Sequence, residues 1–315
     1  MVEVDMMGNT IHNWDMLERG YTMHHAISQD KQGNILATVS KTSAKIANGK
    51  DVRINDFIIR MDPEKGEILQ EWDLVHMLDS ARYGMTDYNL TADPYAQNAS
   101  NWAHNNGIVE WGNDYLATAR YQGIFKFNKA GGIEWIISPH GYWRDRYLKL
   151  LLNPLHADGT PITDPDVIAG TKNCDDFEWP WGCHTAVPLP NGHIFYFNNG
   201  YGRNFKLDFT DRKNVYTCGI EYEVDEVNRT VRQVWQYGKE RGTAYFTPAR
   251  SGVQYLEQTG NRLICPGMSN VLSNGNRGAR VTEVDPETQE IVFELELEDA
   301  IYQRVYRMPL YPDNQ

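Results

Sequence analysis

The sequence contains no apolar run that approaches the eighteen residues of a membrane-spanning helix, and its start, MVEVDMMGNT, has neither a cationic nor an apolar leader segment. We therefore expect no membrane association and no signal peptide in the chain as printed. Basic residues are scarce as well, with 30 against 42 acidic residues and a formal charge of -12. This charge repels nucleic acid unless the basic residues gather in one patch, and the sequence shows no such patch. We expect no nucleic-acid partner.

Cysteine is sparse too. Of the four cysteines, the only close pair is Cys174 and Cys183, in a loop-like stretch. Their spacing fits a small disulfide and fits two free thiols equally well. A zinc site built from both thiols and His184 is disfavoured, because no second cysteine-rich pair accompanies them.

What the sequence does contain is a repeat: an apolar run that ends in Asp or Asn, a turn, another apolar residue and then an aromatic residue. Each copy has the signature of a β-hairpin, because residues that favour turns are flanked by β-branched and aromatic residues. The copies are VEVDMMGNTIHNW, IIRMDPEKGEILQEW, FKFNKAGGIEW, YEVDEVNRTVRQVW and TEVDPETQEIVF.

A second strand pair precedes each of the later hairpins, as in HHAISQDKQGNILATVS and HTAVPLPNGHIFYF, which makes a four-stranded unit. Radial repetition of such units predicts an all-β fold, a β-propeller of four-stranded blades with five repeats visible. We expect a single domain over residues 1–315, with a helical and loop insertion at about 138–183 whose helix lies around WRDRYLKLLL. The first hairpin lacks inner strands and the C-terminal RVYRMPLY lacks an outer hairpin, so these halves could pair and close the ring.

The innermost strands of a propeller line its axial channel, so polar residues at the starts of these strands converge. Histidine stands at three of the four starts, which lie at His24-His25, His104, His184 and Arg250. Because side chains alternate along a strand, we expect only one of His24 and His25 to face the channel. Counted from the apolar residue of each strand, His24 matches His184 and His25 matches Asn106, and the sequence does not choose between them.

Arg120, at the end of YLATARYQG, follows the His104 strand by one hairpin arm. Its guanidinium suits a pair of anionic oxygens, although a surface pairing with an acidic neighbour is equally open. Imidazoles, an amide and an arginine together suit a tetrahedral oxyanion, with one imidazole as nucleophile. Three histidines also suit zinc or copper, but the arginine opposes a cation and no acidic residue stands at an inner-strand start. We expect no metal.

At these residues the sequence resembles the bacterial arylsulfate sulfotransferases, propeller enzymes that use aryl sulfates rather than an activated nucleotide sulfate. The resemblance runs from about Tyr21 to Tyr311, through YTMHHAI, NWAHNNGI, ATARYQG, WIISPHGYW, FEWPWGCHTAVPLPNG, NNGYGR and EYEVDEVNRTVRQVWQYGKERG. It implies six blades and a periplasmic or secreted location. That oxidising location also favours a disulfide between Cys174 and Cys183, which is the least specific of the features that the resemblance implies.

The resemblance further implies a ping-pong reaction without a cofactor, between a small aryl sulfate donor and a phenolic acceptor. His184 would attack sulfur and become a transient sulfohistidine. His104, Asn106 and Arg120 would hold the sulfuryl oxygens together with His24 or His25. A non-catalytic propeller that binds an anionic or aromatic ligand is the alternative, and a metal-dependent lyase or oxidase is a third. The sequence leaves a homodimer open.

Overall fold

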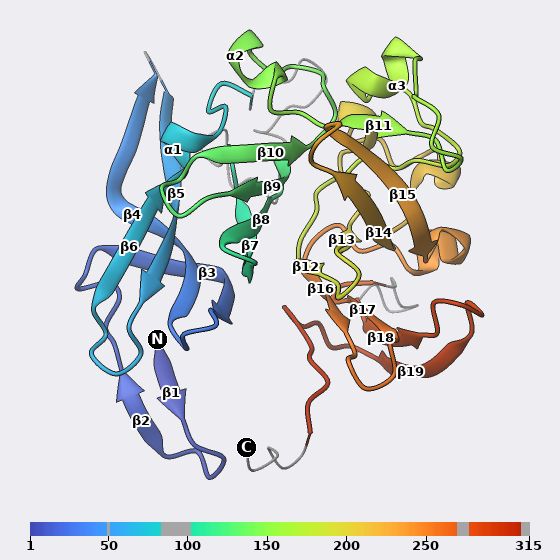
Figure 1. Cartoon of the computed structure of the whole chain (residues 1–315). Coiled ribbons are helices and arrows are strands. Elements are labelled where there is room, and N and C mark those ends of the chain that lie inside the picture. The colour runs from blue at the N-terminus through green and yellow to red at the C-terminus, as the bar shows by residue number, and fades with distance from the viewer. Residues whose placement is uncertain (49–50, 83–101, 270–276, 310–315) are drawn as a thin grey trace.

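The computed structural model describes residues 1–48, 51–82, 102–269 and 277–309. The fold is a β-propeller whose sheets follow one another around the molecule from the N-terminus to the C-terminus (Figure 1). Each of four sheets is an antiparallel meander in which the first strand is the innermost and the last is the outermost. Within these ranges, no helix is both long enough and apolar enough to cross a membrane.

The strands of the four blades are short and consecutive in the chain. Blade one consists of β3 (Tyr21–Gln29), β4 (Ile35–Asn48), β5 (Asp51–Met61) and β6 (Ile68–Asp73). Blade two consists of β7 (Asn105–Trp111), β8 (Asp114–Ala119), β9 (Gly123–Phe127) and β10 (Ile133–Ile137). Blade three consists of β12 (Ala186–Pro188), β13 (Ile194–Asn198), β14 (Cys218–Asp225) and β15 (Thr230–Tyr237). Blade four consists of β16 (Ser251–Tyr255), β17 (Arg262–Pro266), β18 (Ala279–Val284) and β19 (Ile291–Leu297).

An additional hairpin of β1 (Val2–Val4) and β2 (Thr10–Asn13) precedes blade one. All five predicted hairpins are therefore present. The elements of the described ranges make up four complete blades and this hairpin, so the sixth blade that the resemblance implies is not among them. Residues 300–309 and the β1–β2 hairpin share no strand pairing in the described parts of the chain, and the expected closure of the ring by these two halves is not formed there.

The Asp or Asn of each repeat has a common structural role. Its side-chain oxygen accepts a hydrogen bond from the backbone N–H two residues further on, at donor–acceptor distances of 2.8 to 3.1 Å. This is the Asx-turn interaction, which folds the chain back into a hairpin. The residues that make it are Asp5, Asp62, Asn128, Asp225 and Asp285.

The aromatic residue that ends each repeat joins one blade to the next. Trp72 Nε1 donates to Lys129 O at 3.0 Å, and Lys129 lies in the hairpin turn of the following blade. Trp135 Nε1 likewise donates to Glu226 Oε1 at 2.8 Å, and Trp235 Nε1 donates to Pro286 O at 3.0 Å. The corresponding residue of blade four, Phe293, has no following blade in the described ranges and is 48% exposed.

The insertion contributes to blade three instead of standing apart from it. Its strand β11 (Asn153–Leu155) pairs in parallel with β15 as a fifth strand, and its helices are α2 (Asp145–Leu148) and α3 (Pro165–Ala169). The predicted helix around WRDRYLKLLL is only the four residues of α2, because the chain then becomes extended: Ile136 N donates to Leu150 O and Leu152 N donates to Ile136 O. The remaining helices are α1 (Leu74–Met77) and 3₁₀ turns at Arg203–Phe205, Arg212–Asn214 and Lys239–Ala244.

Substitution at the aromatic position of the repeat tests this contact between blades. We expect Trp72→Ala to lower the free energy of unfolding by about 3–5 kcal/mol, because it empties a buried site. Trp72→Phe should cost about 1–2 kcal/mol, because it keeps most of the packing and loses the hydrogen bond to Lys129. Phe293→Ala is the matched control at the exposed copy and should change stability little. Urea unfolding followed by circular dichroism measures all three, and equal losses for Trp72→Ala and Phe293→Ala would contradict the assignment.

Candidate active site

Histidines from three blades meet at the inner edges of their sheets. His24 and His25 lie in β3, His104 directly precedes β7, and His184 lies two residues before β12. The Nε2 atoms of His25 and His104 are 3.1 Å apart, and the ring centroids of His25 and His184 are 6.2 Å apart. The structure thus gathers the histidines that the repeat predicts at the strand starts.

Both His24 and His25 belong to this cluster, so the expectation that only one of them turns inward is wrong. Their Nδ1 atoms are 3.0 Å apart. The reason is a break in the strand: His25 has a φ of 52°, and the pairing of β3 with β4 shifts register between Met23 and Ile27. A left-handed residue interrupts the alternation of faces on which the expectation depended. His104 has the same backbone character, with a φ of 55°. Such backbone strain is typical of functional sites.

A buried carboxylate at one end of the cluster orients its imidazoles. Asp56 is 2% exposed, and its Oδ1 lies 3.4 Å from His24 Nε2. A carboxylate only accepts hydrogen bonds, so this contact favours a proton on His24 Nε2. The ring nitrogens of His24, His25 and His104 form a continuous row of contacts that begins at the Asp56 carboxylate.

Asp56 is held in its ionised form. Burial raises the pKa of this carboxyl, but the hydrogen bond and charge of His24, the backbone N–H of Asn105 and the hydroxyl of Ser40 together bring the pKa below its usual value. The Asn105 N–H donates to Asp56 Oδ2 at 2.9 Å and the Ser40 hydroxyl donates to Oδ1 at 3.0 Å. The carboxylate is thus fixed by the residue that follows His104.

His184 is oriented by a different partner. Its ring is 1% exposed, and its Nδ1 lies 2.6 Å from Asn199 Oδ1. The Asn199 amide cannot be turned round without cost, because its Nδ2 donates to Thr247 O at 2.9 Å and to the Ser251 hydroxyl at 3.2 Å. Its Oδ1 therefore accepts, and His184 carries its proton on Nδ1. The lone pair is left on Nε2, for which the described residues offer no hydrogen-bond partner.

The imidazoles of His184, His25 and His104 are neutral. Burial, followed by the charge of Arg120, lowers the pKa of His184 to about 3. Burial is also the largest cause at His25 and His104, whose pKa values fall well below the usual value, and the neighbouring imidazoles lower them further. A neutral imidazole with a bare nitrogen is a nucleophile at ordinary pH.

Two arginines supply positive charge next to these neutral rings. Arg120 follows β8, is 3% exposed, and donates to Pro248 O at 2.7 Å. Its Cζ lies 4.5 Å from the centroid of the Tyr201 ring. Arg304 comes from the C-terminal segment and donates to Asn106 O. Both charges lower the pKa of His184. Such fixed cations can hold an anionic group beside the imidazole.

Asn106 contacts the residue that precedes His184. It is fully buried, and its Nδ2 donates to Cys183 O at 2.9 Å, the carbonyl directly before His184. This contact fixes the backbone of the residue that carries the imidazole. The amide thus positions His184, whereas the expected contact with sulfuryl oxygens has no counterpart in a structure without substrate.

A pocket with aromatic walls lies beside the cluster. It includes the arginines Arg82 and Arg120, and Gly182 places it two residues from His184. Its aromatic walls are Tyr121, Trp181, Tyr201 and Phe205. Tyr121 also packs edge-on against His104, with ring centroids 6.0 Å apart. Such a lining suits a flat ring that carries negative charge.

The expected Cys174–Cys183 disulfide is not formed, and both residues are free thiols. Cys183 is fully buried, and its Sγ lies 3.8 Å from Ala119 O. Cys174 is partly exposed, and its Sγ donates to Asp176 at 3.1 Å. The two thiols therefore have separate partners.

Sequence reasoning missed three residues of the site, Asp56, Asn199 and Arg304. Asp56 lies in the middle of β5, the third strand of blade one, whereas the polar residues predicted for the site stand at the starts of innermost strands. Asn199 lies in NNGYGR, directly after β13. Because β13 is the strand that returns beside β12, this motif is the signal from which Asn199 could have been predicted. Arg304 lies in RVYRMPLY, the C-terminal segment that lacks an outer hairpin. A place for Arg304 near the inner strands could therefore have been predicted.

Comparisons with known proteins identify the family of the chain. A family model described as arylsulfotransferase (ASST) matches residues 1–307. The arylsulfate sulfotransferase AssT of Escherichia coli O6:H1 (strain CFT073) is 28% identical over 344 residues, and that of Lelliottia amnigena is 29% identical over 345 residues. Each alignment covers 99% of this chain and 57% of the relative, so the chain spans little more than half the length of the curated relatives it matches. Because the family match extends over nearly the whole printed sequence, the chain belongs to the arylsulfotransferase family.

Proposed function

We propose that this protein transfers a sulfuryl group from an aryl sulfate to a phenol, with His184 as the nucleophile. One observation carries the proposal: a buried neutral imidazole is fixed through Nδ1 by Asn199 and keeps its lone pair on Nε2, and the charges of Arg120 and Arg304 act on this ring. The names of the two relatives supply the reaction class.

The reaction proceeds in two displacements. In the first, His184 Nε2 attacks the sulfur of the donor, an S–N bond forms, and the aryl oxygen leaves with the electrons of the broken S–O bond. In the second, the oxygen of a phenolic acceptor attacks the same sulfur, and the electrons of the S–N bond return to Nε2. The departing aryl oxide takes a proton from solvent, and the proton of the acceptor passes to the imidazole cluster, which returns it to solvent before the next turnover. The Asp56 carboxylate stabilises the protonated cluster.

The surroundings of His184 suit both the transferred group and the aryl group. Arg120 and Arg304 stabilise the charge of the sulfuryl oxygens, because fixed donors in a buried site need no reorganisation when charge develops. The pocket beside Gly182 has aromatic and cationic walls, and because its free volume is only about 20 Å³, its side chains must move apart before the ring of the donor or acceptor can enter. Asn106 holds the Cys183 carbonyl, and through it the position of the nucleophile. The reaction requires no cofactor.

The direct test is sulfuryl transfer from 4-nitrophenyl sulfate to phenol without any nucleotide. We expect nitrophenol release and formation of phenyl sulfate by the unaltered chain, and loss of both in His184→Ala. His193→Ala is the matched control, because this histidine lies in the same blade and pairs with Glu221 away from the cluster. It should keep the activity. Activity that survives in His184→Ala, or reversible binding of the donor without release, would overturn the proposal.

The pH dependence of the first displacement follows from the lowered pKa of His184. Because that pKa is about 3, the ring stays neutral from pH 7.5 to 5.5. The rate of the first turnover, measured without acceptor, should therefore be nearly constant over this range. A histidine of ordinary pKa, about 6.5, would lose about tenfold. Stability falls as the pH drops below about 6.5, since the unfolded chain binds protons that the folded one excludes, so circular dichroism accompanies the assay. A tenfold fall with an intact fold would contradict the assignment.

The role of Asn199 can be tested separately. Asn199→Ala removes the acceptor that fixes the His184 tautomer. We expect kcat to fall by at least about tenfold and by no more than the about 10⁴-fold that a wrong tautomer costs a serine protease, with little change in the KM of the donor. Asn191→Ala, in the surface turn of the same blade, is the control. A change in KM alone would mean that Asn199 contributes only to binding.

A further inference from the structure

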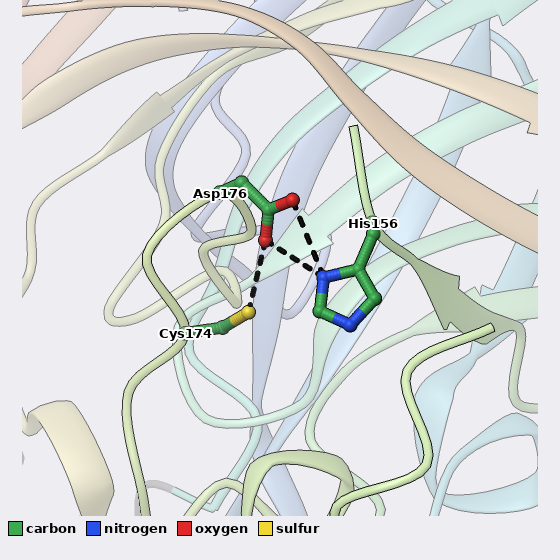
Figure 2. Close-up of side chains that lie close together, drawn as sticks. All are labelled: His156, Cys174 and Asp176. Atoms are coloured by element: carbon green, nitrogen blue, oxygen red, sulfur yellow. Dashed lines mark hydrogen bonds and ion pairs between the residues drawn. The ribbon is translucent and has the colours of Figure 1, made fainter. Parts of the chain in front are cut away.

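Cys174 is the only one of the four cysteines that is not fully buried, and it lies in a polar cluster away from the histidine site. Figure 2 shows its thiol, the carboxylate of Asp176 and the imidazole of His156 turned toward one another. His156 Nδ1 lies 3.0 Å from Asp176 Oδ1, and Cys174 Sγ lies 3.1 Å from the same oxygen. The donor atoms of all three residues lie within 4.8 Å of one another.

Two segments of the insertion meet here. His156 directly follows β11, and the other two residues lie in the loop that runs from α3 toward His184. The backbone N–H of Ala157 donates to Asp176 Oδ2 at 2.9 Å. This bond fixes the carboxylate so that its other oxygen faces the thiol and the imidazole. Contacts from both segments therefore already hold the three side chains close together before any ion binds.

The donor set determines which ion fits. A thiolate, an imidazole and one carboxylate oxygen are ligands of zinc, whereas magnesium and calcium require oxygen ligands throughout. Zinc bonds of about 2.0 to 2.3 Å in a tetrahedron place neighbouring ligand atoms about 3.3–3.5 Å apart. The observed separations of 3.0 and 3.1 Å need only a small outward movement to match.

The cluster is also open to solvent. The side chains of His156 and Asp176 are 39% and 37% exposed, so an ion can reach the donors and keep one water as a fourth ligand. The other thiols lie at fully buried positions, Cys183, Cys218 and Cys265. A thiol-binding ion that enters from solvent therefore meets Cys174 first.

We propose that His156, Cys174 and Asp176 bind one zinc ion that fastens the two segments of the insertion together. On binding, the Cys174 thiol releases its proton to solvent and the ring proton of His156 moves from Nδ1 to Nε2. Sulfur–zinc and nitrogen–zinc bonds form, and the hydrogen bonds from the thiol and the imidazole to Asp176 are replaced by shared coordination. The segment held in this way continues through Glu178, which forms a buried ion pair with Arg203, to His184. The ion would thus secure the start of the segment that ends at the candidate nucleophile.

The test uses the full chain, freed of metal, and zinc or cobalt salts alone. We expect one equivalent of zinc to slow the reaction of Cys174 with a thiol reagent, and cobalt to give the thiolate-to-metal absorption band of a tetrahedral site. His156→Asn and Asp176→Asn should each weaken zinc binding at least about tenfold, because loss of a ligand exceeds the loss of an outer hydrogen-bond partner, about 10–100-fold. Cys174→Ser should abolish the cobalt band.

His76→Asn is the matched control, because His76 pairs with Asp73 on the surface without a thiol nearby. It should leave zinc binding unchanged. Equal affinity in His156→Asn and the unaltered chain, absence of the cobalt band, or no protection of Cys174 would each overturn the proposal. Circular dichroism confirms that each variant is folded. None of these readouts depends on sulfuryl transfer, so the outcome is independent of the proposed function.

Discussion

The hydrogen bond between His184 Nδ1 and Asn199 Oδ1 is the interaction on which the candidate chemistry depends. At 2.6 Å, and with the amide fixed by Thr247 and Ser251, it decides which imidazole nitrogen carries the proton. The other nitrogen keeps the lone pair and is the candidate nucleophile. Without this bond the ring would divide between two tautomers and two orientations. Asn199 directly follows β13, so the strand paired with β12 presents the amide to His184, which lies two residues before β12. The geometry of this hairpin therefore sets the orientation of the His184 ring.

Burial is the second constraint, and it also keeps a lone pair available on the imidazoles by lowering their pKa values. Water would protonate these imidazoles at mildly acidic pH, whereas the closed inner edges of the blades keep them neutral. Arg120 and Arg304 strengthen this effect and also supply the charge that an anionic substrate needs. The negative charge of the cluster, Asp56, lies behind His24, where it orients rings without facing the nucleophile. Charge is thus distributed so that an anion is attracted and an imidazole stays neutral.

The sequence predicted the fold well because its repeat has a local cause. Each anchor such as Asp62 makes its own Asx turn, and each aromatic residue such as Trp72 contacts the turn of the next blade. Both effects are visible over a few residues. The convergence of the histidines followed from the repeat. The positive φ of His25 did not, because backbone strain depends on neighbours that the sequence does not place. Asp56 and Asn199 were missed for the same reason: each comes from a different strand than the histidine it orients.

The Cys174–Cys183 disulfide that the resemblance implied was the other failure, whereas the spacing of the two residues had left free thiols equally open. Cys174 and Cys183 are close in sequence, yet one faces Asp176 and the other is buried beside Ala119. Asp176, two residues after Cys174, in turn contacts His156 and Ala157, about twenty residues earlier in the chain. No local pattern predicts that meeting. The zinc site that we infer there depends on tertiary contacts between two segments of the insertion, which the sequence does not show.

The central claim is that His184 becomes covalently sulfurylated, and peptide mapping tests it most directly. The chain is incubated with an aryl sulfate in the absence of acceptor, quenched in alkali, digested and analysed by mass spectrometry. The account predicts a sulfuryl adduct on the peptide that contains His184, located on the ring nitrogen Nε2 and removed when phenol is added before the quench. Turnover without any adduct, or an adduct on another residue that phenol discharges, would contradict it.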